Sequence, residues 1–168
     1  MNSANPSTRF VRRQIPALVG WVLICFAAAS LGGLFMPGQW YASLKKPTWN
    51  PPAWIFGPVW ISLYILMGIS LFCVWRRPDS SGYRTALVFF FIQLILNILW
   101  SMAFFGLRSP LSGLVVILFL WMAILLTIWS FLKVSRMGGL LLLPYLLWVS
   151  FAMLLNAALW RLNSPIQP

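Results

Sequence analysis

Amide and aromatic side chains recur at helical spacing in three parts of this sequence. Flat aromatic rings beside a few amide groups are typical of a pocket for a large, planar, apolar ligand. The same spacing is also typical of plain packing, and an amide inside a membrane helix commonly joins two helices. Spacing alone leaves both interpretations open. The three helix faces are Trp60, Tyr64 and Met67; Gln93, Asn97, Trp100, Ser101 and Phe104; and Pro144, Trp148, Ala152 and Asn156.

The residues for conventional catalysis are missing. The chain has no histidine, and its single acidic residue, Asp79, lies in a polar stretch. General acid–base catalysis, catalytic triads and proton-coupled transport therefore lack their usual groups. Cys25 and Cys73 have no CxxC spacing, so neither a disulfide framework nor a zinc site is expected. We expect no metal and no obligatory cofactor, which leaves binding, passage, or chemistry performed by the ligand itself.

A stretch rich in aromatic residues and prolines, residues 40–52, separates the first two apolar segments. Lys45 and Lys46 require water or lipid headgroups, the aromatic rings suit the membrane interface, and the prolines restrict the backbone. Such a segment is neither a solvated linker nor a helix. We expect it to cover one end of a helix bundle as a lid over a pocket.

The overall composition is that of a membrane protein, because 61% of the residues are hydrophobic and only 8% are charged. Five runs carry no charge, and each holds at least the roughly 20 residues needed to cross a bilayer. The prediction is an all-α integral membrane protein, a five-transmembrane-helix bundle. One domain over residues 14–163 would lie between polar tails at 1–13 and 164–168. The charge-free runs are 14–44, 47–75, 85–107, 109–132 and 137–160.

Local signals predict where several helices begin and how they pack. Asn50 before two prolines, and Ser109 before Pro110, are typical N-caps. Gly138 and Gly139 predict a break ahead of the fifth segment, and Pro144 a distortion of its first turns. In the first segment, Ala28 with Gly32 would let a neighbouring helix approach closely. The first segment has signal-peptide features, but its apolar run continues long enough to span.

The net charge of +11 reflects basic residues at the ends of the segments. Eight lie on the side that holds the N-terminus and four on the other, which favours a cytoplasmic N-terminus. Nucleic-acid binding is not expected, because the charges follow the membrane boundaries. The eight basic residues on the side of the N-terminus are Arg9, Arg12, Arg13, Arg76, Arg77, Arg84, Lys133 and Arg136. The four on the other side are Lys45, Lys46, Arg108 and Arg161.

These residues form a set of motifs that resembles the translocator protein family. That family is also called TspO/MBR, the tryptophan-rich sensory proteins or the peripheral benzodiazepine receptors. The resemblance extends from the first segment to Asn163. Its motifs are Trp40-Tyr41-x-x-Leu44-x-Lys46-Pro47-x-Trp49-x-Pro51-Pro52, Pro58-Val59-Trp60 with Tyr64 and Met67-Gly68, Gln93-x-x-x-Asn97-x-x-Trp100 with Phe104-Phe105, and Pro144-Tyr145-x-x-Trp148-x-x-Phe151-Ala152 with Leu155-Asn156.

The resemblance implies a five-helix bundle, commonly a homodimer, with the first loop folded over a pocket. Members bind porphyrins, notably protoporphyrin IX, and drug-like isoquinolines and benzodiazepines, and animal members bind cholesterol. Matching positions imply that Trp40, Tyr41 and Pro51 form the lid of the pocket. They imply one wall made of Trp60, Asn97 and Trp100, and an opposite wall made of Trp148, Ala152 and Asn156.

The leading hypothesis is a bacterial membrane receptor or transporter-like protein that binds tetrapyrroles and so regulates their level, export or a stress response. An alternative is light- and oxygen-dependent porphyrin breakdown, for which Trp60 and Trp148 are the matching candidates. A third is an accessory protein that acts through partner proteins. The helical spans favour the bacterial cell membrane, although some relatives have been assigned to the outer membrane.

The sequence departs from the family at two places. The sterol-recognition pattern of animal members requires a tyrosine where Ala157 and Ala158 precede Arg161, so we expect weak sterol affinity. The small-residue dimer contact of the third segment is not matched, because Val88 and Ile92 stand near those positions. The homodimer therefore stays an expectation from the family alone.

Overall fold

The computed structural model describes residues 6–35 and 37–164, and within that part it contains helices and no strand. Five helical segments are long and apolar enough to cross a membrane, which confirms the predicted all-α membrane bundle. Two further short helices, α2 and α6, precede α3 and α7. The elements are α1 (Pro6–Gly33), α2 (Gln39–Ser43), α3 (Ala53–Trp75), α4 (Tyr83–Ser101), the π-helix η1 (Met102–Gly106), α5 (Pro110–Val134), α6 (Arg136–Leu140) and α7 (Leu143–Asn163).

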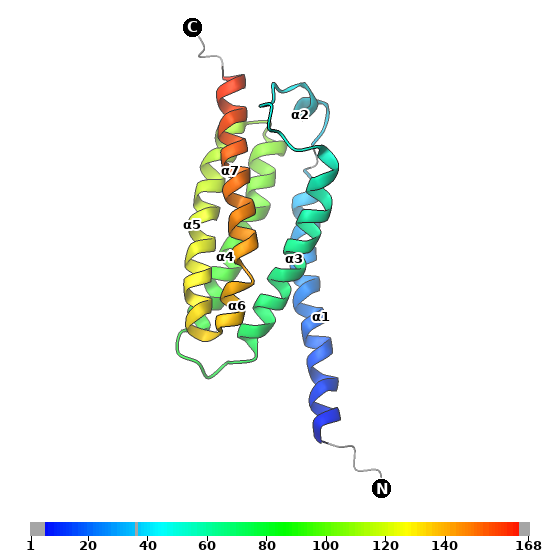
Figure 1. The fold of residues 1–168 in the computed structure, drawn as a ribbon, viewed down its shortest axis with the longest axis vertical. Helices are drawn as coiled ribbons and strands as arrows, with labels where there is room; N and C mark the ends of the chain where they lie inside the picture. Colours follow the sequence, from blue (N-terminus) through cyan, green and yellow to red (C-terminus); the bar gives the residue numbers. More distant parts are fainter. Residues whose placement is uncertain (1–5, 36, 165–168) are drawn as a thin grey trace.

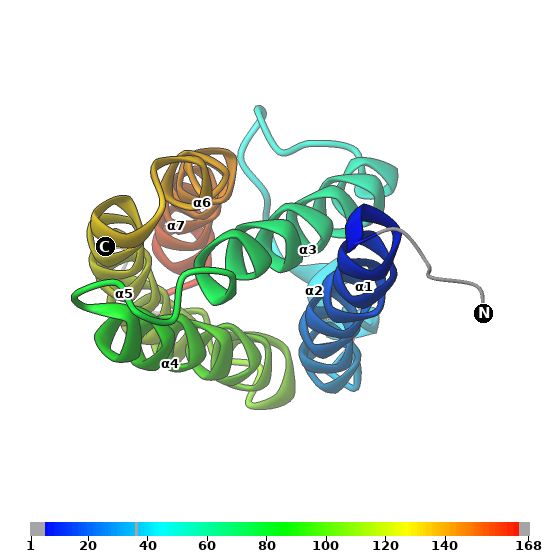
Figure 2. The ribbon, with the colours of Figure 1, turned by 90° about the horizontal axis from the view of Figure 1, so that it is seen from below.

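The long helices run roughly parallel to one axis, with α2 at the end of the bundle that also holds the end of α7 (Figure 1). Helices α4 and α5 form the predicted antiparallel hairpin, and α7 packs on α5. Helix α1 packs against α3 and α4 (Figure 2), while α3 meets the fifth span through α6, at the end away from α2. Residues of α1, α3, α4 and α7 line a cavity beneath the first loop.

Small residues allow α1 to approach its neighbours. A β-carbon on Gly32 would lie 3.2 Å from Ser101 Oγ of α4, and one on Gly68 of α3 would lie 2.6 Å from Val22 Cα. Ala28, which like Gly32 belongs to α1, is also buried. The predicted Ala28–Gly32 pattern therefore serves a contact with α4 of the same chain.

Helix α5 begins as predicted, whereas the predicted cap of α3 is wrong. Ser109 Oγ accepts a hydrogen bond from the Ser112 N–H at 3.2 Å. Helix α3 begins at Ala53 with Pro52 in the cap position and no side-chain cap. The physical reason is that Pro52 adopts an extended conformation (φ −57°, ψ 141°), which separates Asn50 from the first turn.

The predicted glycine break in the fifth span is also displaced. Gly138 and Gly139 lie inside α6 and are buried. The packing there is tight, since a β-carbon at Gly139 would lie 2.6 Å from the Leu132 side chain. The break follows at Leu141–Leu142, just before Pro144 in the first turn of α7. Proline suits that place because its missing N–H would have no partner there.

Helix α1 begins at Pro6, so it covers part of the segment expected as a polar tail at 1–13. Residues 1–5 and 165–168 of the two predicted tails lie outside the described residues. The first loop contains α2, so the expectation that no helix forms there is wrong for Gln39–Ser43. The rest of that loop is irregular, as expected.

Basic residues lie at both ends of the bundle, divided as the hydropathy pattern predicts. Arg76 and Arg136 lie at the end where α1 begins, and Lys46 and Arg161 lie at the end with α2 (Figure 1). The sole acid of the chain, Asp79, lies between α3 and α4 at the first of these ends. The end with α2 therefore carries no acidic side chain among the described residues.

Candidate functional site

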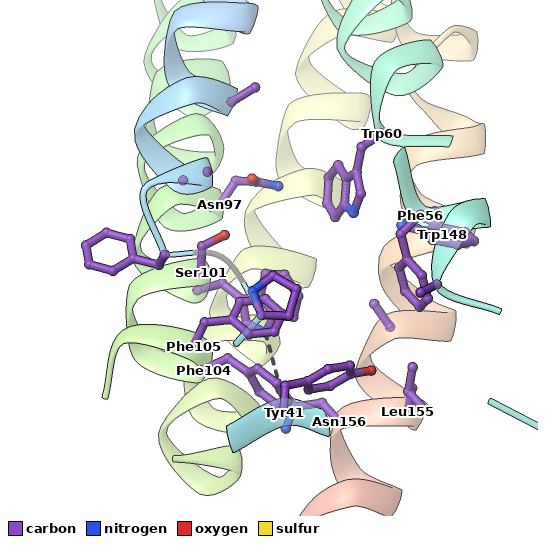
Figure 3. A pocket seen from close by; sticks show the side chains of 18 of the residues that line it. Tyr41, Phe56, Trp60, Asn97, Ser101, Phe104, Phe105, Trp148, Leu155 and Asn156 are labelled. Atoms are coloured by element: carbon purple, nitrogen blue, oxygen red, sulfur yellow. Dashed lines mark hydrogen bonds between the residues drawn. The ribbon is translucent and has the colours of Figure 1, made fainter. Parts of the chain in front are cut away.

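A cavity of about 550 Å³ lies beneath the first loop (Figure 3). Its volume is within the range of small-molecule sites, and its lining is mainly apolar. Helices α1, α3, α4 and α7 supply the walls, and the loop with α2 covers it. The principal lining residues are Phe26, Ala29, Tyr41, Lys46, Asn50, Pro51, Phe56, Trp60, Tyr64, Asn97, Trp100, Ser101, Phe104, Phe105, Trp148, Ala152, Leu155 and Asn156.

Aromatic rings form the walls of the cavity. The Trp60 and Tyr64 rings are stacked, with centroids 5.6 Å apart, and the Trp100 ring lies 6.5 Å from that of Trp60. The Phe56 ring meets the Trp148 ring edge-on at 5.7 Å. Figure 3 shows Trp60, Phe56 and Trp148 on one side and Asn97 with Ser101 on the other. Such a lining is complementary to a flat, apolar ligand.

The π-helix η1 sets the position of two further rings. Its wide turn is closed by a hydrogen bond from the Leu107 N–H to the Met102 carbonyl at 2.8 Å. Phe104 and Phe105 both meet the Tyr41 ring edge-on, with centroid distances of 6.1 and 5.6 Å. A π-turn adds a residue to the helix and so brings adjacent side chains toward one neighbour. Helical spacing predicted Phe104 here and the family motifs included Phe105, but neither predicted the π-turn.

Asn97 joins three helices at the deep end of the cavity. Its Oδ1 accepts a hydrogen bond from the Tyr64 hydroxyl at 2.7 Å, and its Nδ2 donates to the Tyr145 hydroxyl at 2.9 Å. All three side chains are at most 7% exposed. Tyr145 does not line the cavity, yet its ring packs edge-on against Trp60 at 6.3 Å. Asn97 therefore both joins helices and lines the cavity.

Asn156 has the same double role nearer the lid. Its Oδ1 accepts from Trp100 Nε1 at 3.2 Å, and its Nδ2 donates to the Pro110 carbonyl at 2.6 Å. A β-carbon on Gly113 would lie 2.9 Å from Asn156 Oδ1, so a glycine is required for this close approach. These bonds fix the orientation of Trp100, with Phe104 stacked on it at 5.8 Å.

The lid is fastened by Lys46. Its ammonium donates to the carbonyls of Tyr41, Ala42 and Leu44 at 2.7, 3.0 and 3.1 Å. It also lies 4.9 Å from the centroid of the Tyr41 ring. These carbonyls are at the C-terminal end of α2, where a cation is favoured. Sequence reasoning placed Lys46 in water or headgroups and missed this role.

All the predicted site residues except Trp40 line the same cavity. Tyr41, Pro51, Trp60, Asn97, Trp100, Trp148, Ala152 and Asn156 all line the cavity. Trp40 does not, and its ring packs edge-on against Phe104 at 5.7 Å, where it supports the wall. Burial raises the pKa of the Tyr41 phenol, which is therefore neutral at physiological pH.

Two polar atoms at the cavity have no hydrogen-bond partner among the described residues. They are Oδ1 of Asn50 and Nε1 of Trp148, and both atoms are buried. Gln93 is 1% exposed and both its amide atoms also lack such a partner, but it lies below the cavity and does not line it. Cys25 and Cys73 are free thiols. The described residues hold no cluster of three or more potential metal ligands.

Comparison with known proteins gives consistent matches along the chain. The profile of the TspO/MBR family matches residues 21–161. The tryptophan-rich protein TspO of Chlorobaculum tepidum is 44% identical over 91% of this chain and 99% of its own length. The tryptophan-rich sensory protein of Cereibacter sphaeroides is 39% identical over 83% of this chain and 86% of its own. The human translocator protein is 36% identical over 89% of this chain and 90% of its own.

Proposed function

The chain belongs to the TspO/MBR family, and on that premise we propose that it binds protoporphyrin IX and similar planar tetrapyrroles beneath its lid. The observation that carries the proposal is the aromatic slot formed by Trp60, Trp100 and Trp148 in one cavity. A macrocycle inserted there would replace contacts with water or lipid by contacts with indole rings. Each well-placed aromatic pair contributes about 0.5–1.5 kcal/mol beyond the area it buries.

The hydrogen bonds of the walls support a preformed site. The amides of Asn97 and Asn156 hold Tyr64 and Trp100 in place through bonds between helices. A ligand that enters a preformed cavity loses less free energy to the ordering of side chains. The walls therefore favour rigid planar ligands over flexible ones of equal area.

Movement of the lid would let a ligand reach this cavity. Tyr41 and Pro51 cover the cavity, and Lys46 holds α2 in its closed form. We infer that the lid opens to admit the ligand and closes over it. The occupied, closed form would be the state by which the protein reports or controls tetrapyrrole level.

We place the protein in the bacterial cytoplasmic membrane, with the lid on the far side from the cytoplasm. The five spans make it an integral, multi-pass membrane protein. The excess of basic residues at the end where α1 begins supports a cytoplasmic N-terminus. Tetrapyrroles would then reach the lid from the outer leaflet or the space beyond it.

The test is a titration of purified protein with protoporphyrin IX in the dark, followed by tryptophan fluorescence. Wild-type quenching should saturate, and Trp60→Phe and Trp148→Phe should each weaken the affinity. Trp129→Phe is the matched control, because that indole is 56% exposed on α5 beneath Lys133. Linear quenching that is equal in all four proteins would mean partitioning into detergent and would overturn the proposal.

A further inference from the structure

The two unpartnered polar atoms of the cavity form a complementary pair. Trp148 Nε1 is a buried donor and Asn50 Oδ1 a buried acceptor. The identity of the acceptor is fixed because the other amide atom, Asn50 Nδ2, donates to the Pro51 carbonyl at 3.0 Å. A buried polar atom without a partner destabilises a structure, so a ligand that supplies the partner gains affinity.

Asn50 and Trp148 both line the cavity, one from the first loop and the other from α7. Asn50 directly follows Trp49, whose ring meets the Phe151 ring edge-on at 5.9 Å. The Phe151 ring in turn lies 5.4 Å from that of Trp148. The loop and α7 are thus joined through a row of aromatic rings.

The unpartnered acceptor at Asn50 favours a neutral partner group over an ionised one. Lys46 is the single charged residue among the described residues that line it, and its ammonium is engaged by three backbone carbonyls. A carboxylate offers acceptors only, so it would repel Asn50 Oδ1. A neutral carboxylic acid offers a donor and an acceptor side by side.

Accepting the proposed function, we propose that the cavity binds its tetrapyrrole with one carboxyl group in the neutral, protonated form. The acid O–H donates to Asn50 Oδ1, and the acid carbonyl accepts from Trp148 Nε1. Asn50 is then the residue that selects the protonation state of the ligand. Affinity is fully present below the pKa of the ligand's carboxyl group and is lost as the pH rises above it. The titratable groups that face the site are Tyr41, Lys46 and Tyr64.

The experiment compares two ligands on two proteins. Protoporphyrin IX has the acid O–H, whereas its dimethyl ester keeps the macrocycle and the carbonyl but has no donor. At pH 5.5, Asn50→Leu should weaken binding of the free acid by roughly 5- to 50-fold. The ester has no donor for Asn50 Oδ1, so its binding should weaken less than that of the acid. Saturable binding of the ester also shows that the variant is folded and the cavity intact.

The pH dependence provides the second arm. Affinity of the wild type for the acid should fall about tenfold for each pH unit above the carboxyl pKa. Affinity for the ester should stay constant, because the two ligands share the same ring. An equal effect of Asn50→Leu on acid and ester would overturn the inference. So would acid binding that strengthens with pH and is lost in Lys46→Met, since that result means an ionised carboxylate.

The outcome is separable from that of the proposed function. Saturable binding of the ester with no discrimination by Asn50 would leave the tetrapyrrole site standing and remove only the inference on protonation. Failure of both ligands to saturate would remove the proposed function itself.

Discussion

Asn163 and Lys45 are joined by two reciprocal hydrogen bonds, although 118 residues separate them in the chain. Asn163 Oδ1 accepts from the Lys45 N–H at 2.9 Å, and its Nδ2 donates to the Lys45 carbonyl at 3.0 Å. The last turn of α7 thereby holds the first loop across the cavity. The side chain of one asparagine acts on the backbone of the lid as a neighbouring strand would.

Removal of this clamp should loosen the lid. We expect Asn163→Ala to lose about 1–2 kcal/mol of lid closure and to speed ligand dissociation about 5- to 30-fold. The measurement is stopped-flow release of protoporphyrin IX from detergent-purified protein. Ser62→Ala is the control, because its hydroxyl bonds the Pro58 carbonyl of its own helix. Equal release from both variants would contradict a clamping role.

Lys46 should act on the lid from within. Lys46→Met removes the donor for three carbonyls, so the amides of Gln39–Ser43 should exchange with deuterium about tenfold faster or more. Lys45→Met is the matched control, since Lys45 is exposed and its backbone rather than its side chain makes the bonds to Asn163. Unchanged exchange in Lys46→Met would show that the ammonium does not hold α2.

Asn97 should contribute more to stability than its single side chain suggests. Asn97→Ala leaves the hydroxyls of Tyr64 and Tyr145 unpartnered in the bundle core. We expect a loss of about 1–3 kcal/mol in the free energy of unfolding, measured by denaturation in mixed micelles. Thr127→Val is the comparison, because Thr127 is buried but bonds only the Ala123 carbonyl of its own helix. If Asn97→Ala lost no more free energy of unfolding than Thr127→Val, this contribution of Asn97 to stability would be refuted.

Gly68 should tolerate no side chain. An added β-carbon would lie 2.6 Å from the backbone of Val22, so Gly68→Ala should separate α1 from α3 at a cost of about 1–3 kcal/mol. Gly20→Ala has the opposite expectation, because nothing lies within 4 Å of its β-carbon position. Alanine there should be neutral or stabilise the helix by up to about 1 kcal/mol. Thermal unfolding of both variants tests these expectations. A Gly68→Ala variant as stable as the wild type would contradict the close packing of α3 on α1 at Val22.

Much of the bundle follows from the sequence, because charge-free runs and helical spacing reflect local constraints. The Trp60, Tyr64 and Met67 face turns inward as predicted, and so do Trp148, Ala152 and Asn156 of the fourth-residue repeat in α7. Pro144, the first residue of that repeat, is exposed in the first turn of α7. The choice between packing and pocket could not be made from spacing. The hydrogen bonds of Asn97 and Asn156 show why, since each amide joins helices and lines the cavity at once.

The features that the sequence did not predict depend on distant contacts. The π-turn of η1 lies where Gly106 faces Phe35 and where Tyr41 meets Phe104 and Phe105. Helix α2 is short and owes its C-terminal bonds to Lys46, a residue outside it. Trp40 was expected to line the cavity and does not, for the same reason. The direction of α2 decides whether the Trp40 ring or the adjacent Tyr41 ring faces the cavity.

The central claim is that a planar ligand occupies the cavity beneath the lid, and the most direct test fills that cavity. Ala152→Trp adds an indole from the wall of α7, and Leu154→Trp adds the same group on the same helix where Leu154 is 62% exposed. We predict that Ala152→Trp weakens saturable binding of protoporphyrin IX more than about tenfold, while Leu154→Trp stays within about twofold. Equal affinities of the two folded variants would contradict the account.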